Sequence, residues 1–154
     1  MKSSKIVLAV ASAALLSLFS IGNAEEKSDK VDTVKCVVAG KEIKIADAKE
    51  VPYKKATVYV CCNGCKAKME KDSKKYAAKA NHQLVLTGQA KQVKCPIAGR
   101  PVNEDKTVKV EGVKVAFCCG GCEGKAKKAE GEELVALVFS DKAFEKGFEV
   151  KEKK

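Results

Sequence analysis

An internal repeat is the feature that most constrains the fold of this chain. VKCVVAGKEI, which begins at Val34, recurs 59 residues later as VKCPIAGRPV from Val93. KKATVYVCCNGCKAKMEK, from Lys54, recurs 57 residues later as EGVKVAFCCGGCEGKAKK from Glu111. Self-similarity over about 60 residues indicates a duplicated structural module. The expected boundaries are 25–33 for a polar leader, 34–90 for the first module, 91–150 for the second and 151–154 for a tail.

The eight cysteines of the chain divide evenly between the two modules. The first module contains Cys36, Cys61, Cys62 and Cys65, and the second contains Cys95, Cys118, Cys119 and Cys122. A module of about 60 residues buries too little apolar surface for a large core, and small domains commonly need a disulfide or a metal ion to fold. Each module is therefore expected to have its own cysteine-based site.

The pattern of the first module predicts an α+β fold. VKC and EIKIA flank the turn VAGK at 38–41 and are expected to form a short hairpin. The β-rich segment ATVYV at 56–60 is expected to be a strand that ends at the adjacent cysteines. Good helix formers then predict a helix from Cys65 to residue 80. The module is thus a small hairpin, a strand, a tight turn and a helix.

The second module has the same order of predicted elements. VKVEGVKVAFCC predicts a hairpin with Glu111 and Gly112 at its turn, and a helix is expected to begin near Cys122. The segment ELVALVF at 133–139 is expected to be a strand, although periodicity does not distinguish so short an apolar run from a helix. The predicted class of the whole chain is therefore α+β.

A strand followed directly by a helix brings particular cysteines together. Neighbouring residues of a strand point to opposite faces, so the side chains of Cys61 and Cys62 diverge. Cys65 lies in the first turn of the helix, where the partial positive charge of the helix N-terminus favours a thiolate. We favour convergence of Cys65 with Cys61, and Cys36 is presented toward them by its glycine turn.

Three convergent thiolates are ligands that soft metal ions prefer, and zinc and copper(I) are the expected ions. A structural zinc site has four ligands. Cys62, and by analogy Cys119 in the second module, supplies the fourth ligand if the strand bends there. Otherwise water fills the position, or the ion is three-coordinate copper(I).

A cysteine on a glycine turn, followed by C-x3-C at a strand-to-helix turn, resembles the TRASH/YHS group of small treble-clef-like metal-binding domains. CPIAGRPV with GVKVAFCCGGC is the closer match, and the resemblance covers nearly all of both modules. It implies heavy-metal binding in sensing, trafficking or resistance. The ligands that it implies are Cys36, Cys61 and Cys65 in the first module and Cys95, Cys118 and Cys122 in the second. Ala39 and Ala98 stand where a full zinc knuckle has another cysteine, which departs from a four-cysteine zinc site.

Two other interpretations of the cysteines remain open. An even number of cysteines per module is also typical of disulfide-stapled structural or interaction modules in an oxidising compartment, and Cys36 could pair with Cys61 or Cys65. Cys62 and Cys65, like their counterparts in the second module, also have the C-x-x-C spacing of thiol–disulfide oxidoreductases. Each module is too short for a thioredoxin-like βαβ sheet, so that motif has no scaffold here.

Other residue types give no indication of an enzyme. His82 is the only histidine, so a catalytic Ser-His-Asp set cannot occur in both modules. We expect His82 at the surface or at a strand edge rather than as a metal ligand, and Met69 in the core rather than as a copper ligand. The sequence contains no recognisable phosphate-binding loop. We therefore do not expect catalysis.

The first 24 residues have the pattern of a secretory signal peptide. Lys2 and Lys5 precede an uncharged apolar run at 6–21, and Gly22-Asn23-Ala24 ends it before the expected cleavage site. The run is shorter than the roughly 20 residues of a membrane-spanning helix. We expect cleavage after Ala24, a periplasmic or secreted product, and no stable membrane insertion after cleavage.

The charge and the aromatic content argue against a nucleic-acid partner. The chain has a net charge of +10, but its lysines are interleaved with acidic residues. Aromatic residues make up only 5% of the chain and tryptophan is absent, which leaves few side chains on which bases could stack. The expected partners are metal ions and a metal donor or acceptor protein.

Overall fold

The structure is a computed structural model that describes residues 31–151. The expected signal peptide at 1–24, most of the leader and most of the tail lie outside the described residues. The described part is mixed α+β, as predicted, with five α-helices and eight short strands. The strands form four two-stranded antiparallel sheets. Within 31–151, no helix combines the length and apolar character needed to cross a membrane.

The first repeat forms two hairpins followed by two helices. Its elements are β1 (Thr33–Lys35), β2 (Glu42–Lys44), β3 (Lys49–Tyr53), β4 (Ala56–Val60), α1 (Asn63–Lys71) and α2 (Ala77–Leu86), with 3-10 turns at Ile45–Asp47 and Lys74–Tyr76. β1 pairs with β2 as expected, and β3 pairs with β4. Lys54 and Lys55 turn the second hairpin with φ of 46° and 63°, and two positive φ values match the right-handed twist of the paired strands.

The predicted helix from Cys65 to residue 80 is wrong in its extent. α1 begins earlier, at Asn63, and it ends at Lys71 because Asp72 leaves the helical conformation with φ −147°. The Asp72 carboxylate accepts a hydrogen bond from the Lys75 backbone N–H at 3.2 Å and so begins the next helical segment. This break separates α1, which borders the cysteines, from α2, which turns toward the second repeat.

The second repeat has one long hairpin and three helices. Its elements are β5 (Ala90–Gln92), β6 (Asn103–Val110), β7 (Val113–Phe117), α3 (Gly120–Lys128), α4 (Gly131–Phe139), α5 (Asp141–Gly147) and β8 (Phe148–Val150). The predicted hairpin turn is confirmed, with Glu111 and Gly112 at φ of 43° and 92°. The backbone of this turn packs against α2, the helix contributed by the first repeat.

The predicted strand at 133–139 is wrong, because this segment belongs to helix α4. Val135, Val138 and Phe139 are its buried residues, and their spacing of three and four places them on one helical face. Glu132 and Glu133 lie in the first turn, where the helix dipole favours acidic side chains. The apolar run is therefore a buried helix face that contacts α2.

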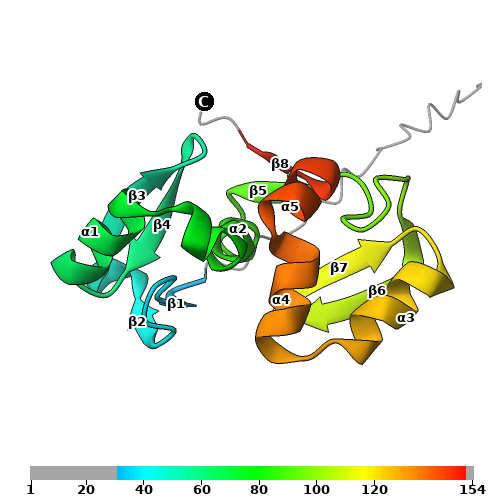
Figure 1. The fold of residues 1–154 in the computed structure, drawn as a ribbon, viewed down its shortest axis with the longest axis horizontal. Helices are drawn as coiled ribbons and strands as arrows, with labels where there is room; N and C mark the ends of the chain where they lie inside the picture. The colour runs from blue at the N-terminus through cyan, green and yellow to red at the C-terminus, as the bar shows by residue number, and fades with distance from the viewer. Residues whose placement is uncertain (1–30, 152–154) are drawn as a thin grey trace, which may run out of the picture.

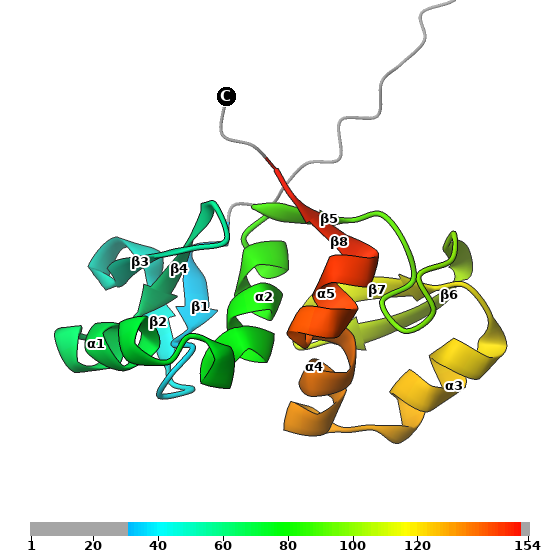
Figure 2. The same cartoon turned by 45° about the horizontal axis from the view of Figure 1, so that its top comes forward.

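Helices from both repeats form the centre of the molecule. Figures 1 and 2 show α2 beside α4 and α5, with the hairpins and α1 of the first repeat on one side and β6, β7 and α3 on the other. β5 and β8 pair along one edge of this central region. Buried residues of both repeats belong to one hydrophobic cluster, which includes Val58, Leu84, Val115, Phe117 and Phe139.

Polar side chains of the first repeat contact the start of α5 in the second. The Asp141 carboxylate accepts hydrogen bonds from Lys54 Nζ at 2.6 Å and from Asn81 Nδ2 at 3.1 Å. Asn81 Nδ2 also donates to the Phe139 carbonyl at 2.9 Å. These contacts connect the first repeat to the start of α5, although Asn81 Oδ1 stays a buried acceptor with no hydrogen-bond partner among the described residues.

Glutamine side chains bind the unpaired backbone edges of strands β4 and β7. Gln83 Oε1 accepts from the Tyr59 N–H at 2.6 Å, and Gln83 Nε2 donates to the Tyr59 carbonyl at 3.1 Å. Gln92 makes the same pair of contacts with the backbone of Ala116, at 2.9 and 2.6 Å. Tyr59 and Ala116 are equivalent residues of the two repeats. In each repeat, the backbone N–H and carbonyl of this residue bind a glutamine side chain where a neighbouring strand could otherwise pair.

Candidate metal centres

The first candidate centre begins with a loop that presents Cys36. The Cys36 N–H donates to the Lys41 carbonyl, and the Gly40 N–H donates to the Cys36 carbonyl, both at 2.8 Å. Gly40 has φ +69°, a conformation that glycine adopts without the strain of a side chain. The resulting turn places the Cys36 side chain inside the fold, where it is 0% exposed.

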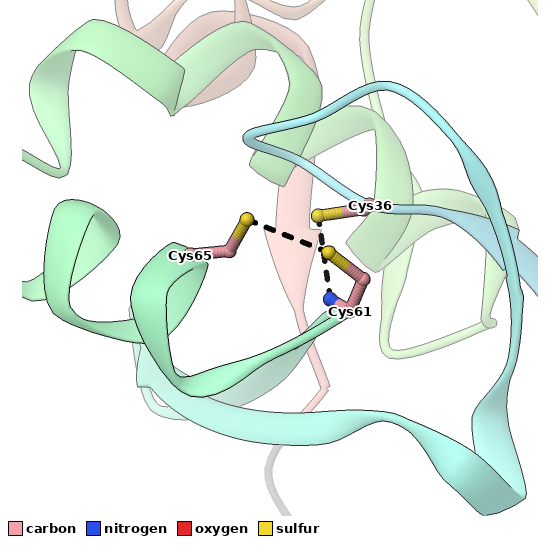
Figure 3. A group of neighbouring side chains, drawn as sticks. All are labelled: Cys36, Cys61 and Cys65. Carbon is pink, nitrogen blue, oxygen red and sulfur yellow. Dashed lines mark hydrogen bonds between the residues drawn. The ribbon is translucent and has the colours of Figure 1, made fainter.

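The strand-to-helix junction supplies the other two sulfurs of this centre. Cys61 follows the last residue of β4, and Cys65 lies in the first turn of α1. The three sulfurs of Cys36, Cys61 and Cys65 all lie within 4.8 Å of one another, and Cys61 Sγ is 3.5 Å from Cys65 Sγ. Figure 3 shows the side chains pointing toward one another from the loop, the strand end and the helix.

The second repeat builds the same arrangement from Cys95, Cys118 and Cys122. Their sulfurs also lie within 4.8 Å of one another, with Cys118 Sγ 3.8 Å from Cys122 Sγ. Gly99 has φ +67°, and its N–H donates to the Cys95 carbonyl at 2.7 Å, as Gly40 does at Cys36. The six cysteines expected as ligands are therefore gathered into two groups of three.

The sulfur spacing fits a metal ion at the centre of each group. A zinc–sulfur bond of about 2.3 Å gives sulfur–sulfur separations of about 3.8 Å in a tetrahedral site and about 4.0 Å in a trigonal plane. The observed contacts of 3.5 Å and 3.8 Å are close to these values. A disulfide has an S–S bond of about 2.05 Å, and all eight cysteines are free thiols in the structure. Each group can thus hold a soft metal ion.

Backbone N–H groups stabilise the thiolate form of Cys36, the cysteine in the loop. Burial acts to raise the pKa of the Cys36 thiol, but the N–H groups of Ala39, Cys61 and Val38 outweigh it, and the pKa is lowered. The N–H groups of Ala39 and Cys61 each lie 3.4 Å from Cys36 Sγ. At Ala39, where a full zinc knuckle has another cysteine, a backbone donor faces the sulfur. Burial also acts to raise the pKa of Cys95, but the N–H groups of Cys118, Ala98 and Ile97 outweigh it, and the pKa is lowered.

The pKa of Cys65, the cysteine in the helix, is raised rather than lowered. Burial and the neighbouring thiols of Cys61 and Cys62 raise the pKa of Cys65 to about 12. Burial and the corresponding neighbours raise the pKa of Cys122 to about 12 as well. Since a metal ion binds the thiolate, it must displace protons from these buried thiols.

Cys62 and Cys119, which could have been fourth ligands, lie outside the groups of three. Both side chains are exposed, and each residue is the N-cap of its helix, α1 or α3. Cys62 Sγ is 3.7 Å from Cys61 Sγ, and Cys119 Sγ is 3.8 Å from Cys118 Sγ. The backbone N–H of Cys65 at the helix start, with further donors, lowers the pKa of Cys62 to about 7.

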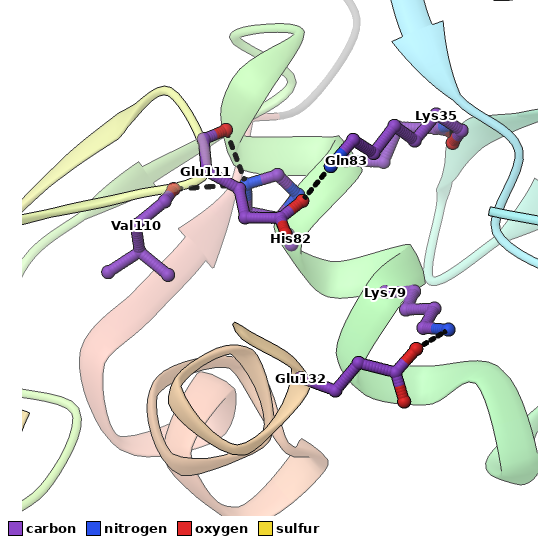
Figure 4. Close-up of polar contacts among 7 residues, drawn as sticks. All are labelled: Lys35, Lys79, His82, Gln83, Val110, Glu111 and Glu132. Carbon is purple, nitrogen blue, oxygen red and sulfur yellow. Dashed lines mark hydrogen bonds and ion pairs between the residues drawn. The ribbon is translucent and has the colours of Figure 1, made fainter. Parts of the chain in front are cut away.

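His82 lies in a different place from the one expected. It is 8% exposed, so a surface or strand-edge position is wrong, and it is not part of either cysteine group. Its Nε2 lies 3.2 Å from the Val110 carbonyl and 3.1 Å from the Glu111 carbonyl, at the turn of the β6–β7 hairpin (Figure 4). Met69 is 1% exposed, as expected for a core residue.

Residues that support the second centre were not found by sequence reasoning. The Gly147 carbonyl accepts hydrogen bonds from the N–H groups of Val93, at 2.8 Å, and Lys94, at 3.1 Å. A Cβ at Gly147 would lie 2.8 Å from Pro96 Cα, so α5 approaches the loop of Cys95 closely. No sequence signal links these positions, which are more than fifty residues apart.

Comparisons of the chain with protein-family models, curated proteins and solved structures find no significant match. The resemblance to TRASH/YHS domains therefore stays a prediction. The features of this chain that indicate a function are the two cysteine groups and the elements that place them.

Proposed function

We propose that this protein binds soft metal ions, copper(I) or zinc, at two sites of three thiolates and serves to buffer, traffic or deliver them. The observation that carries the proposal is the repeated geometry: a glycine loop, a strand end and a helix start bring three sulfurs within 4.8 Å of one another in each repeat. Two groups built from equivalent elements are stronger support than one group alone.

The two metals make different demands on the sites. Copper(I) is stable with three thiolates, so Cys36, Cys61 and Cys65 would complete its coordination. Zinc takes a fourth ligand in structural sites, and water or the nearby Cys62 would have to supply it. Cys36 and Cys65 are buried and Cys61 is half-buried, whereas Cys62 is exposed. This arrangement favours an ion that needs no fourth ligand from the protein.

The proposal extends to family, compartment and partners. A loop cysteine facing a strand-to-helix junction supports treble-clef-like modules of the TRASH/YHS kind. The pattern of residues 1–24 supports export to the periplasm or secretion. A non-enzymatic role in metal handling then calls for a metal donor or acceptor protein as the partner.

Native mass spectrometry of the reduced mature chain, residues 25–154, tests the proposal. After loading with copper(I) or with zinc, we expect two bound ions per chain, one for each cysteine group. Cys36→Ser and Cys95→Ser should each leave one ion bound, and the double variant should bind none. Thr87→Ser, which keeps the side-chain hydroxyl and belongs to neither cysteine group, is a control that should keep both ions.

Three results would contradict the proposal. A reduced chain that binds no ion, or variants that all keep two ions, would remove the cysteine groups as metal sites. An intact mass of the native protein that is lower by two hydrogens per cysteine pair, with no metal uptake after reduction, would support the disulfide interpretation instead.

A further inference from the structure

Each repeat places one exposed thiol directly beside its group of three. Cys62 and Cys119 have nearly the same backbone conformation, with φ of −161° and −160° and ψ of 168° and 166°. In this extended conformation each side chain points away from the face on which its predecessor, Cys61 or Cys118, enters the group. The exposed sulfur still lies within 3.8 Å of that predecessor's sulfur in both repeats.

The helix residue next to each exposed sulfur is a glycine. Gly64 lies in the first turn of α1 and Gly121 in the first turn of α3, and glycine favours a helix less than alanine does. Neither has the positive φ that would require glycine. Apart from its chain neighbours and the nearby helix backbone, a Cβ built there would meet one group of the described residues within 4 Å, the exposed sulfur of Cys62 at 3.9 Å or of Cys119 at 3.8 Å. The absence of a side chain keeps each sulfur uncovered.

We propose, building on the metal-binding function above, that Cys62 and Cys119 are exchange ligands through which soft metal ions enter and leave the two sites. The partner is a donor or acceptor that holds the ion through thiolates. Cys62 is not within 4.8 Å of all three sulfurs of its group, so it is placed to meet the partner rather than to hold the ion at rest.

Transfer proceeds by replacement of one thiolate with another. Cys62 Sγ binds the incoming ion, its S–H proton goes to the donor thiolate, and the bond between that thiolate and the ion breaks. Cys61 Sγ, 3.7 Å away, then binds the ion, and its proton goes to Cys62 Sγ as the bond between Cys62 and the ion breaks. Cys36 and Cys65 bind in turn to complete the site, and their protons go to the remaining thiolates of the donor or to water. The charge of the ion is unchanged, and no electron is transferred.

Stopped-flow mixing of the reduced chain, residues 25–154, with copper(I)–glutathione tests this role. The thiolate–copper absorption reports the uptake of the ion. The double variant Cys62→Ser with Cys119→Ser should take up copper at least about tenfold more slowly, and it should still bind two ions with the affinity of the wild type.

A second pair of variants tests the access route with all eight cysteines present. Gly64→Leu with Gly121→Leu should cover the exposed sulfurs and slow uptake without changing the final amount bound. Gly124→Leu is the matched control, because Gly124 lies in α3 and a Cβ there meets nothing within 4 Å. This control should take up copper at the wild-type rate.

The outcomes separate this inference from the function on which it rests. Wild-type uptake of two ions, with unchanged rates in the serine and leucine variants, would overturn the exchange role and leave metal binding in place. If the serine double variant loses bound ions or metal affinity as well as uptake rate, Cys62 and Cys119 hold the ion in the loaded protein, which would overturn the exchange role. A wild-type chain that binds no copper would overturn both.

Discussion

The sulfur of Cys36 shows how single residues determine the candidate centres. It is fully buried, yet the N–H groups of Ala39 and Cys61 point at it and lower its pKa. The spacing of the cysteines predicted which sulfurs would meet, because a strand end, a helix start and a glycine turn are all local patterns. The support that Gly147 gives to the loop of Cys95 depends on distant segments, and no local pattern encodes it.

Gly147→Ala should destabilise the protein and weaken the second centre. The new Cβ would lie 2.8 Å from Pro96 Cα and 2.9 Å from the Lys94 carbonyl oxygen, both backbone atoms that cannot move without shifting the loop. We expect a loss of about 1–3 kcal/mol in the free energy of unfolding. Urea denaturation measures the loss, and native mass spectrometry should show weaker binding of one ion out of two.

Gly124→Ala is the matched control for this substitution. Its Cβ would meet nothing within 4 Å, and alanine favours the helix by up to about 1 kcal/mol. Equal stability of the two variants would mean that the close approach of α5 to the loop does not constrain the second centre.

At the scale of elements, short apolar runs were the least predictable part of the chain. The hairpin of β6 and β7 followed from alternation and from its Glu111-Gly112 turn. The run ELVALVF also looked like a strand, and only packing against α2 from the other repeat decides that it is a helix. His82 belongs to the same contact, since α2 presents it to the β6–β7 turn. Its single occurrence in the sequence gave no sign of this.

The contact of α2 with the β6–β7 turn should weaken in mild acid. Burial lowers the pKa of His82 below 6.5. The Val110 carbonyl and Glu111 act to raise this pKa but only partly offset burial, and Lys35 lowers it slightly further. As the pH falls below about 6.5, the unfolded chain takes up a proton that the folded chain takes up only at lower pH. The stability contributed by neutral His82 is therefore complete above that pH and is lost as the pH falls toward the folded pKa.

Urea midpoints of wild type and His82→Gln, measured at about pH 7 and about pH 5, check this expectation. The wild type should lose more stability than the variant between the two values, because titrations of other groups cancel in the comparison. The variant should also be less stable at neutral pH by about 1–2 kcal/mol, since the two carbonyls lose their partner. Parallel pH dependence in both proteins would mean that His82 does not weaken this contact in acid, and equal stability at neutral pH would mean that it does not stabilise the contact at all.

At the scale of the whole molecule, the two repeats share one core. Residues of both belong to a single buried cluster, and β5 pairs with β8 beside the central helices. The duplication was visible in the sequence, but the packing of α2 against α4 was not, since it depends on faces that meet only in the folded chain. A shared core predicts that the described repeats unfold together rather than one after the other.

Tyrosine fluorescence allows a direct check, because the three tyrosines, Tyr53, Tyr59 and Tyr76, all lie in the first repeat. Val115→Ala removes fully buried carbon atoms from the second repeat and should cost about 2 kcal/mol. In one cooperative unit the tyrosine transition of the variant shifts to lower urea concentration by that amount. An unchanged tyrosine transition, together with earlier exposure of the second-repeat cysteines to a thiol reagent, would mean that the repeats unfold independently.

The proposed function requires each repeat to hold a metal ion with three cysteine sulfurs. X-ray absorption at the metal edge of the doubly loaded mature chain counts those sulfurs directly. With copper(I), we expect three sulfur neighbours per ion at about 2.3 Å and no others in the first coordination sphere. The Cys62→Ser and Cys119→Ser double variant should give the same spectrum. Four sulfurs that fall to three in this variant, or a first coordination sphere dominated by nitrogen and oxygen, would contradict the account.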